Sequence, residues 1–434
     1  MDNSSIVDNI SVALPEGAEY VIWTLNKNNY EAFLVGGCVR DILLGIEPKD
    51  WDIATNALPE DIKIIFKNTA DTGLRHGTIT VMAHNQAIEV TTFRVEGKYS
   101  DHRRPDKVIF TSYLEQDLGR RDFTINSIAY HPQKGIVDPF KGIDDLKKGI
   151  IRAVGEAGKR FEEDALRMLR ALRFSAQLGF NIDTVTMRSI KNKKALIGSI
   201  SKERIRNELE SILLSRNPSK FILLKETGLL ALILPELDKN SFNKNKYILD
   251  GVESVKRDRI LRWAMLLHEE SEDSACSVLK RLKFDNYTIK EVYRLIKYHN
   301  ININPVPECV KKVVSIIGDE LFLKLMMVRK AILNAEIINC SYMSNMLKYS
   351  DNDKYYEKEM GKADIIMHIY NSAKEKRECM NIKDLAVNGS DLINIGFEQG
   401  KKIGEVLELL LDTVMLIPGM NKREELLKLA AQYL

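Results

Sequence analysis

The sequence predicts an α+β protein in which a small mixed β-sheet near the N-terminus is followed by helices alone. Strand-like apolar runs, among them Phe33–Val35, Thr78–Met82 and Ala87–Phe93, all occur before about residue 150. Beyond that point the apolar residues recur at helical spacing, without an internal repeat or a low-complexity tract. We therefore expect four parts, which are a head at residues 1–150, a helical neck at 151–225, a helical body at 226–310 and a helical tail at 311–434.

The composition is that of an ordinary globular protein. The 434 residues are 44% hydrophobic and 29% charged, with a formal net charge of +3, so a surface that binds nucleic acid must be a local basic patch. Five scattered cysteines without a CxxC pair fit reduced thiols in the cytoplasm. The N-terminus lacks the pattern of a secretory signal, and the apolar run Leu229–Leu234 is too short to span a membrane. We expect a cytoplasmic protein with no membrane association and no evident protein partner.

The segment Phe33–Thr55 carries the first candidate site. An apolar strand ends at Gly36–Gly37, a short helical pattern with Arg40 follows, and a second extended segment carries Asp50 and Asp52. Residues two apart on a strand point to the same side, and paired carboxylates repel unless a cation lies between them. Such oxygen ligands suit Mg²⁺, and glycines let phosphates approach the N–H groups of a helix start. The segment therefore predicts a site for a metal-bound nucleoside triphosphate.

The neighbouring segments are predicted to complete the head. Apolar spacing predicts a leading helix over Ala18–Asn26, and Pro59 fits the first turn of a later helix. The stretches Thr78–Met82 and Ala87–Phe93, joined by a short polar turn, predict a β-hairpin. Glu89 on the second strand is either a third carboxylate near the metal or, as we expect, an exposed residue of the sheet.

The run Arg120–Asn126 contains a second candidate site. One interpretation is a capped helix start with a solvated pair of arginines. In the other, Arg121 contacts triphosphate oxygens, while Asp122 and Asn126 hydrogen-bond a ribose hydroxyl. That chemistry would favour ribonucleotides over deoxyribonucleotides.

The stretch Glu163–Phe174 is predicted to be an amphipathic helix on which Asp164, Arg167, Arg170 and Arg173 recur every three residues. An ion pair within the helix beside a solvated basic stripe would explain these charges. The alternative is base recognition. Cytosine and adenine both present an amino donor beside a ring-nitrogen acceptor, and uracil and guanine reverse that order. A carboxylate at Asp164 beside the guanidinium of Arg167 would accept the first two bases and reject the others.

Three of these patterns together resemble a known family. LVGGCVRDILLG with DWD, RRDFTIN, and EDALRMLRALRF are similar to motifs of the class II tRNA nucleotidyltransferases, which include CCA-adding enzymes and bacterial poly(A) polymerases. The resemblance implies a nucleotidyltransferase head of the DNA polymerase beta-like superfamily, with Mg²⁺ held by the catalytic residues Asp50 and Asp52. It implies ATP and CTP as substrates and the 3′ end of tRNA as partner. The implied nucleotide-binding residues are Gly36, Gly37, Arg40, Arg121, Asp122, Asn126, Asp164, Arg167, Arg170 and Arg173.

The activity that the resemblance implies is addition of C, C and A without a nucleic-acid template, with release of pyrophosphate. The charged residues 94–110 predict a surface loop whose Arg103–Arg104 pair contacts RNA phosphates. Family members that add only the two cytidines lack much of this loop, so its presence favours full CCA addition. An A-adding enzyme and a poly(A) polymerase remain as alternatives. A non-catalytic RNA-binding module is a third, which the intact motifs argue against.

The C-terminal half of the chain carries weaker signals. Glu203–Leu209 resembles a further helix motif of the family, and we expect it to brace the neck. His268 stands where some relatives carry a phosphohydrolase motif, but no matching His/Asp set accompanies it, so we expect a structural role. Gly400 and Gly404 resemble the family's tail motif, and either close approach to a phosphate backbone or simple turn chemistry explains them. The helical parts are expected to grip the acceptor arm of tRNA by its shape and phosphates.

Overall fold

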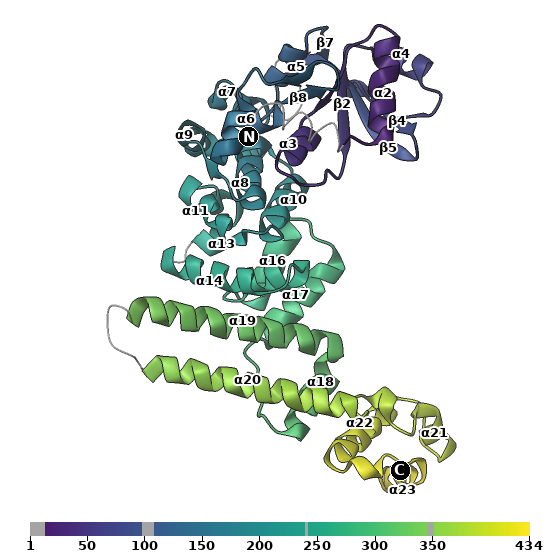
Figure 1. Ribbon diagram of the computed structural model, residues 1–434. Helices are drawn as coiled ribbons and strands as arrows, with labels where there is room; N and C mark the ends of the chain where they lie inside the picture. The colour runs from purple at the N-terminus through teal and green to yellow at the C-terminus, as the bar shows by residue number, and fades with distance from the viewer. Residues whose placement is uncertain (1–13, 98–107, 239–241, 345–350) are drawn as a thin grey trace. The chain divides into compact units, whose positions relative to one another are not determined.

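The computed structural model describes residues 14–97, 108–238, 242–344 and 351–434 (Figure 1). The chain divides into two compact units, Met1–Asp238 and Lys239–Leu434. The predicted fold class, a mixed sheet followed by helices, is confirmed. The finer boundaries at residues 150, 225 and 310 stay predictions.

The first unit is built around a seven-stranded sheet with the strand order β3-β4-β5-β2-β1-β8-β9. Only β2 and β5 pair in parallel among these described strands, and the other neighbours are antiparallel. The strands of this sheet are β1 (Ala32–Val35), β2 (Trp51–Thr55), β3 (Thr69–Gly73), β4 (Thr78–Ala83), β5 (Gln86–Thr92), β8 (Ala129–His131) and β9 (Gly135–Val137). A separate antiparallel pair is formed by β6 (Arg94–Glu96) and β7 (Val108–Phe110).

The sequence patterns explain the centre of this sheet. All four residues of β1 are buried, as the continuous apolar run predicts for a central strand. The expected hairpin is formed by β4 and β5, and its turn residues His84 and Asn85 both have positive φ angles, of 49° and 60°. Positive φ at two adjacent positions matches the twist that a two-residue hairpin turn needs. The leading helix is confirmed as α2 (Glu16–Lys27), which packs its buried side against β1, β2, β4 and β5.

The remaining helices of the first unit surround the sheet or follow it. They are α3 (Gly37–Leu43), α4 (Pro59–Ile65), α5 (Leu114–Gly119), α6 (Gly142–Lys148), α7 (Ala157–Glu163), α8 (Leu166–Leu178), α9 (Thr184–Lys193), α10 (Lys202–Leu213), α11 (Leu223–Thr227), α12 (Leu230–Ile233) and α13 (Pro235–Asp238). Two short strands, β10 (Ile150–Ile151) and β11 (Asn181–Ile182), pair in parallel among these helices. The prediction that strands stop near residue 150 is therefore wrong at this point.

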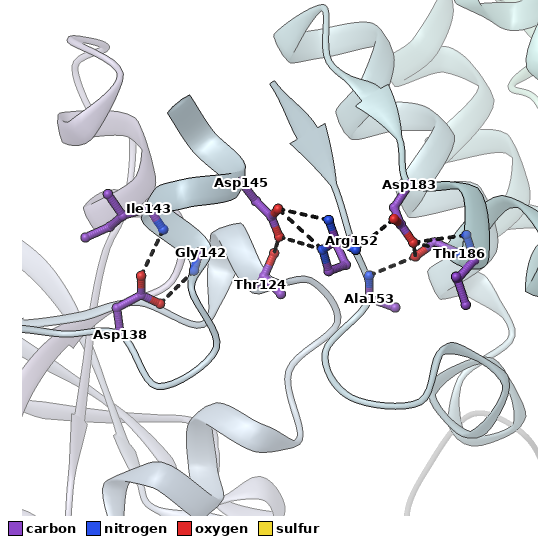
Figure 2. A network of polar contacts seen from close by, with 10 residues as sticks. Thr124, Asp138, Gly142, Ile143, Asp145, Arg152, Ala153, Asp183 and Thr186 are labelled. Atoms are coloured by element: carbon purple, nitrogen blue, oxygen red, sulfur yellow. Dashed lines mark hydrogen bonds and ion pairs between the residues drawn. The ribbon is translucent and has the colours of Figure 1, made fainter. Parts of the chain in front are cut away.

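A network of polar contacts joins the sheet region to the helices that follow it (Figure 2). The carboxylate of Asp145 accepts hydrogen bonds from Thr124 Oγ1 at 2.7 Å and from Arg152 Nε at 3.0 Å. Arg152 also donates from Nη1 to Asp183 Oδ1, at 2.7 Å. Asp183 in turn caps the start of α9, because its side chain accepts from the N–H groups of Val185 and Thr186. One guanidinium thus connects α6 to the N-terminus of α9.

The second unit is helical throughout its described residues. Its helices are α14 (Phe242–Ser254), α15 (Arg259–Leu267), α16 (Glu272–Arg281), α17 (Asn286–Tyr298), α18 (Pro307–Ile317), α19 (Asp319–Ser344), α20 (Asp351–Glu375), α21 (Gly389–Asn394), α22 (Lys401–Leu416) and α23 (Arg423–Ala430). The long helices α19 and α20 lie side by side (Figure 1). Lys311 of α18 is buried and pairs with Glu378, and its Nζ also donates to the carbonyl of Met415 at 3.4 Å.

The composition predicted reduced cysteines and no membrane-spanning segment. The described cysteines Cys38, Cys276, Cys309 and Cys379 are all free thiols. Burial raises the pKa of Cys38 to about 11, and burial likewise raises that of Cys379 to about 11. Within the described ranges, none of the helices combines the length and the apolar character that a membrane crossing needs.

Candidate active site

An open cleft of about 550 Å³ lies in the first unit between the sheet and the helices α8 and α10. Of the twelve residues predicted from the sequence, all but Asp50 line it. The charged side chains of the lining are eight arginines and four carboxylates, namely Arg40, Arg94, Arg120, Arg121, Arg167, Arg170, Arg173, Arg204, Asp52, Glu89, Asp122 and Asp164. This excess of cations suits a polyanionic ligand.

The glycine pair lies where β1 turns into α3. Gly36 has φ +77° and ψ −128°, a backbone conformation that other residues rarely adopt. A Cβ atom at Gly36 would lie 2.7 Å from Nη1 of Arg121, so a side chain there would displace the guanidinium. Gly37 follows as the first residue of α3 and also lines the cleft. Gly36 therefore leaves room for Arg121 to lie against the backbone where β1 turns into α3.

The acidic side of the cleft is formed by neighbouring strands. Asp52 on β2 is paired in register with Glu89 on β5. Glu89 is exposed, as expected, and it also lines the cleft beside Asp52. Asp50 lies in the bend before β2, so only Asp52 lies on the strand, which corrects the prediction that both do. Burial raises the pKa of Asp52 to about 6; Arg121 acts against that rise, and the charges of Glu89 and Asp50 add to it.

A buried carboxylate that the sequence analysis missed holds the arginine pair. Asp117 of α5 is fully buried and accepts hydrogen bonds from Arg120 Nη2 at 2.7 Å and from Arg121 Nη2 at 3.1 Å. It also accepts from the N–H of Arg94, at 3.2 Å. Burial alone would raise the pKa of Asp117, but the two guanidinium groups hold it below its usual range. Asp117 therefore fixes the direction in which Arg121 enters the cleft.

Asp122 and Asn126 form a polar bridge from α3 to α8. Oδ1 of Asp122 accepts from the N–H of Phe123 at 2.9 Å and from Asn126 Nδ2 at 3.0 Å, and Oδ2 accepts from Arg170 Nε at 2.7 Å. Asn126 Oδ1 accepts from Arg40 Nη1 at 2.7 Å. Burial acts to raise the pKa of Asp122, but Arg170 and the other donors hold it well below the usual range. The interpretation of this run as a capped helix start is wrong, because neither Asp122 nor Thr124 caps the short 3₁₀ turn there.

The ring of Phe174 organises three arginines of the cleft. The guanidinium carbons of Arg173, Arg40 and Arg170 lie 4.2, 5.1 and 5.3 Å from its centroid. Cations at this distance from an aromatic face are held by the ring quadrupole. Arg173 is fixed further by Glu208 of α10, whose Oε2 accepts from its Nε at 2.7 Å.

The predicted base-reading pair does not lie on one helix. Helix α7 ends at Glu163 and α8 begins at Leu166, so Asp164 lies at a break between them, with an extended backbone at φ −133° and ψ 104°. The apolar face expected for this stretch is confirmed and buried. Arg167 in the first turn of α8 donates from Nη1 to Glu163 Oε2 at 2.8 Å and from Nη2 to the carbonyl of Arg120 at 2.9 Å.

Known proteins share this architecture and sequence. Residues 32–152 match the family described as the Poly A polymerase head domain, and residues 179–240 match the probable RNA and SrmB-binding site of polymerase A. The CCA-adding enzyme of Lactiplantibacillus plantarum is 41% identical over 288 residues, which cover 65% of this chain and 70% of that enzyme. The chain belongs to the family of CCA-adding enzymes.

Two further relatives of the CCA-adding family differ in how much they cover. The enzyme of Limosilactobacillus reuteri is 50% identical over 206 residues, which are 48% of this chain and 51% of that enzyme. The chain thus spans about half the length of that relative. The crystal structure of the Bacillus stearothermophilus CCA-adding enzyme in complex with CTP is similar over 96% of both chains, with 32% identity and a TM-score of 0.75.

Two further predictions from the sequence concern Arg103–Arg104 and His268. Arg103–Arg104 of the predicted loop lie outside the described residues. His268 follows α15, where it is buried and its Nδ1 lies 2.7 Å from the carbonyl of Met265. That position agrees with the structural role expected for it.

Proposed function

We propose that this protein is a CCA-adding tRNA nucleotidyltransferase, which adds C, C and A to the 3′ end of tRNA from CTP and ATP and releases pyrophosphate. The observation that carries the proposal is the single cleft in which Asp52, Arg121, Asp164 and Arg167 meet. It unites a carboxylate for a metal, cations for a triphosphate and a donor–acceptor pair for a base edge. Its site of action is the cytoplasm.

The carboxylates fit a magnesium ion. A pKa of about 6 for Asp52 reflects a buried charge beside the charges of Glu89 and Asp50, which a divalent cation would offset. No group of three or more metal-ligating side chains occurs in the described parts of the chain. Mg²⁺ usually takes one or two protein carboxylates and completes its shell with phosphate and water oxygens. Asp50 and Asp52 would hold Mg²⁺, which when bound would lower the pKa of the attacking 3′-hydroxyl and neutralise charge on the triphosphate.

The protein's own groups position the nucleotide. Arg121, oriented by Asp117, binds triphosphate oxygens beside Gly36–Gly37, which line the same cleft. Catalysis then consists largely of positioning and charge stabilisation. Arg170 and Arg173, held around Phe174, supply further positive charge near the nucleotide.

Asn126 is the residue that meets the ribose. Asp122 already accepts bonds from Phe123, Asn126 and Arg170, so its role is to orient these partners. Among the described residues, Asn126 uses one amide hydrogen on Asp122 and one acceptor position for Arg40. An amide has two of each, which leaves a donor and an acceptor for a ribose hydroxyl.

The base is chosen by Asp164 and Arg167. The carboxylate accepts from the exocyclic amino group of C or A, and the guanidinium donates to the adjacent ring nitrogen. U and G would leave these groups without partners, which is how a polar site rejects a wrong substrate. The helices that follow bind the acceptor arm of tRNA through its shape and phosphates.

Product length on defined tRNAs tests the function. Transcripts ending at the discriminator base, at C and at CC are each offered CTP, ATP, UTP or GTP with Mg²⁺. With CTP alone, a CCA-adding enzyme adds CC to the first transcript, C to the second and nothing to the third, and with ATP alone it adds A only to the CC-ending transcript. With CTP and ATP together it extends the three transcripts by CCA, CA and A and then stops. Extension of the CC-ending transcript alone would instead identify an A-adding enzyme, and long A tails on any RNA a poly(A) polymerase. No incorporation at all would refute nucleotide transfer.

Three variants assign the chemistry. Asp50→Ala and Asp52→Ala are expected to abolish incorporation while the circular dichroism spectrum stays that of the wild type. Arg167→Ala is expected to reduce the preference for C and A over U. Activity that persists in EDTA would contradict the metal assignment, and full restoration by added Mg²⁺ is the expected result.

A further inference from the structure

The side chain of Asp164 is held in place by a hydrogen bond to the backbone at the start of α8. It lies in the break between α7 and α8, and its Oδ1 accepts from the N–H of Leu166 at 3.0 Å. This bond satisfies one of the N–H groups that the first turn of α8 leaves without a helical partner. The carboxylate is therefore anchored at one oxygen to the start of α8.

A second element reaches the same carboxylate. Arg204 of α10, forty residues further along the chain, donates from Nη2 to Asp164 Oδ2 at 2.9 Å, and its Nη1 lies 3.5 Å from Oδ1. Both side chains are partly covered, with exposed fractions of 27% for Arg204 and 17% for Asp164. Both also line the cleft. A planar guanidinium that faces both oxygens fixes the rotation of the carboxylate as well as its position.

The donors on Asp164 can be counted against its capacity. A carboxylate offers about four acceptor positions. Among the described residues, Leu166 and the two nitrogens of Arg204 occupy three of them. The remaining position is on Oδ2, the oxygen that only Nη2 of Arg204 contacts. A base with an exocyclic amino group would use this one position.

We propose that Arg204 is a positioning residue for base selection, which holds Asp164 so that a single acceptor position is presented to the incoming base. This inference rests on the proposed function and deepens it. The sequence predicted only that the helix motif containing Arg204 braces the neck, and the proposal adds a role in base selection. A carboxylate discriminates between bases only when its orientation is fixed. A carboxylate that rotates freely can turn away from the acceptor atom of U or G and so lose the selectivity. Loss of Arg204 leaves the charge of Asp164 in the cleft and removes its orientation.

The test compares nucleotide choice in three variants. Arg204→Ala removes the guanidinium, and Arg204→Lys keeps the charge without the planar fork. The matched control is Arg206→Ala, on the same helix, whose guanidinium contacts Asn207 at 3.2 Å and Glu210 at 3.8 Å and does not line the cleft. Single-turnover incorporation of CTP and of UTP is measured on the discriminator-ended tRNA, and of ATP and of GTP on the CC-ended tRNA.

The expected result is a loss of selectivity rather than only a loss of rate. The preference for CTP over UTP and for ATP over GTP falls by at least about tenfold in Arg204→Ala. It falls by less in Arg204→Lys and is unchanged in Arg206→Ala. A stability loss alone would slow all four nucleotides equally.

Two outcomes overturn the inference, and a different one concerns the proposed function. Wild-type preference in both Arg204 variants, whatever their rates and melting temperatures, would make Arg204 a structural brace only. If Arg204→Ala does not fold, unchanged preference in Arg204→Lys has the same meaning, because lysine cannot reproduce a fork on both oxygens. Failure of the wild-type protein to prefer C and A would instead refute the proposed function.

Discussion

Replacing Asp52 by asparagine is expected to stabilise the metal-free protein at pH 8 while it abolishes nucleotide transfer. Burial, with Glu89 and Asp50 adding their charges, raises the pKa of Asp52 from 3.8 to about 6. The folded protein therefore binds this proton more tightly than the unfolded chain. The ionised carboxylate costs stability above pH 6, and this cost declines as the pH falls from 6 and is absent below about pH 4.

The size of the effect follows from the shift. A change from 3.8 to about 6 corresponds to about 3 kcal/mol, at about 1.4 kcal/mol per pKa unit. A partly buried asparagine amide costs about 1 kcal/mol in the same place, which leaves a net gain of about 2 kcal/mol. For a unit of this size, that gain corresponds to a rise in melting temperature of about 4–8 °C.

Calorimetric unfolding of chelator-treated protein measures this gain. Wild type and Asp52→Asn are compared at pH 8 and pH 4.5, with Asp50→Asn as the matched control, because Asp50 is exposed. The control is expected to change stability by less than about 0.5 kcal/mol. Added Mg²⁺ should raise the melting temperature of the wild type but not of Asp52→Asn. A variant less stable than wild type at pH 8, or a difference that does not shrink at pH 4.5, would refute the reasoning.

Three other substitutions test separate features. Asp122→Asn leaves Arg170 without its charged partner and should cost about 3 kcal/mol at pH 7 in urea unfolding. Because the pKa of Asp122 is lowered by folding, its contribution is present above about pH 4 and is lost as the pH falls further, so the variant and wild type should converge in acid. Gly36→Ala forces a side chain into a positive-φ position against Arg121, and we expect a loss of about 1–3 kcal/mol with a raised KM for ATP; an unchanged KM would show that Arg121 does not depend on the glycine. Lys311→Met should destabilise the second unit by about 2 kcal/mol, measured as a shift of its own unfolding transition, since its glutamate partner loses a charged bond; a shift of the first unit's transition instead would contradict this.

The sequence predicted those parts of the fold that local spacing determines. The β-rich stretches Thr78–Met82 and Ala87–Phe93, joined by a short polar turn, predicted the hairpin, and the apolar run at Phe33–Val35 predicted a buried strand. The two-residue strands β10 and β11 could not be predicted, because two residues show no periodicity. The residues of the cleft were predicted through their motifs, although their distances from one another were not.

Two features of the site, the helix break at Asp164 and the burial of Asp117, were not predicted. In both, tertiary contacts override the local sequence pattern. The spacing of Glu163–Phe174 fits an unbroken helix, yet Asp164 leaves the helix to bond Leu166 and Arg204. Asp117 looks like an ordinary surface residue of a short helix. Two of its donors, Arg120 and Arg121, are its i+3 and i+4 neighbours, but the third is the N–H of Arg94 from a distant segment, which no local pattern predicts.

Each of the two units contains a buried thiol whose alkylation reports local opening of that unit. Cys38 lies in the first unit, against the carbonyl of Val35 at 3.3 Å, and Cys379 lies in the second. Because burial raises both thiol pKa values to about 11, alkylation at neutral pH requires local opening. Mass spectrometry of the wild-type protein, quenched at successive times of alkylation, would therefore measure the rate of local opening around both cysteines in one experiment. A nucleotide bound in the cleft should slow the labelling of Cys38 and leave that of Cys379 as an internal clock.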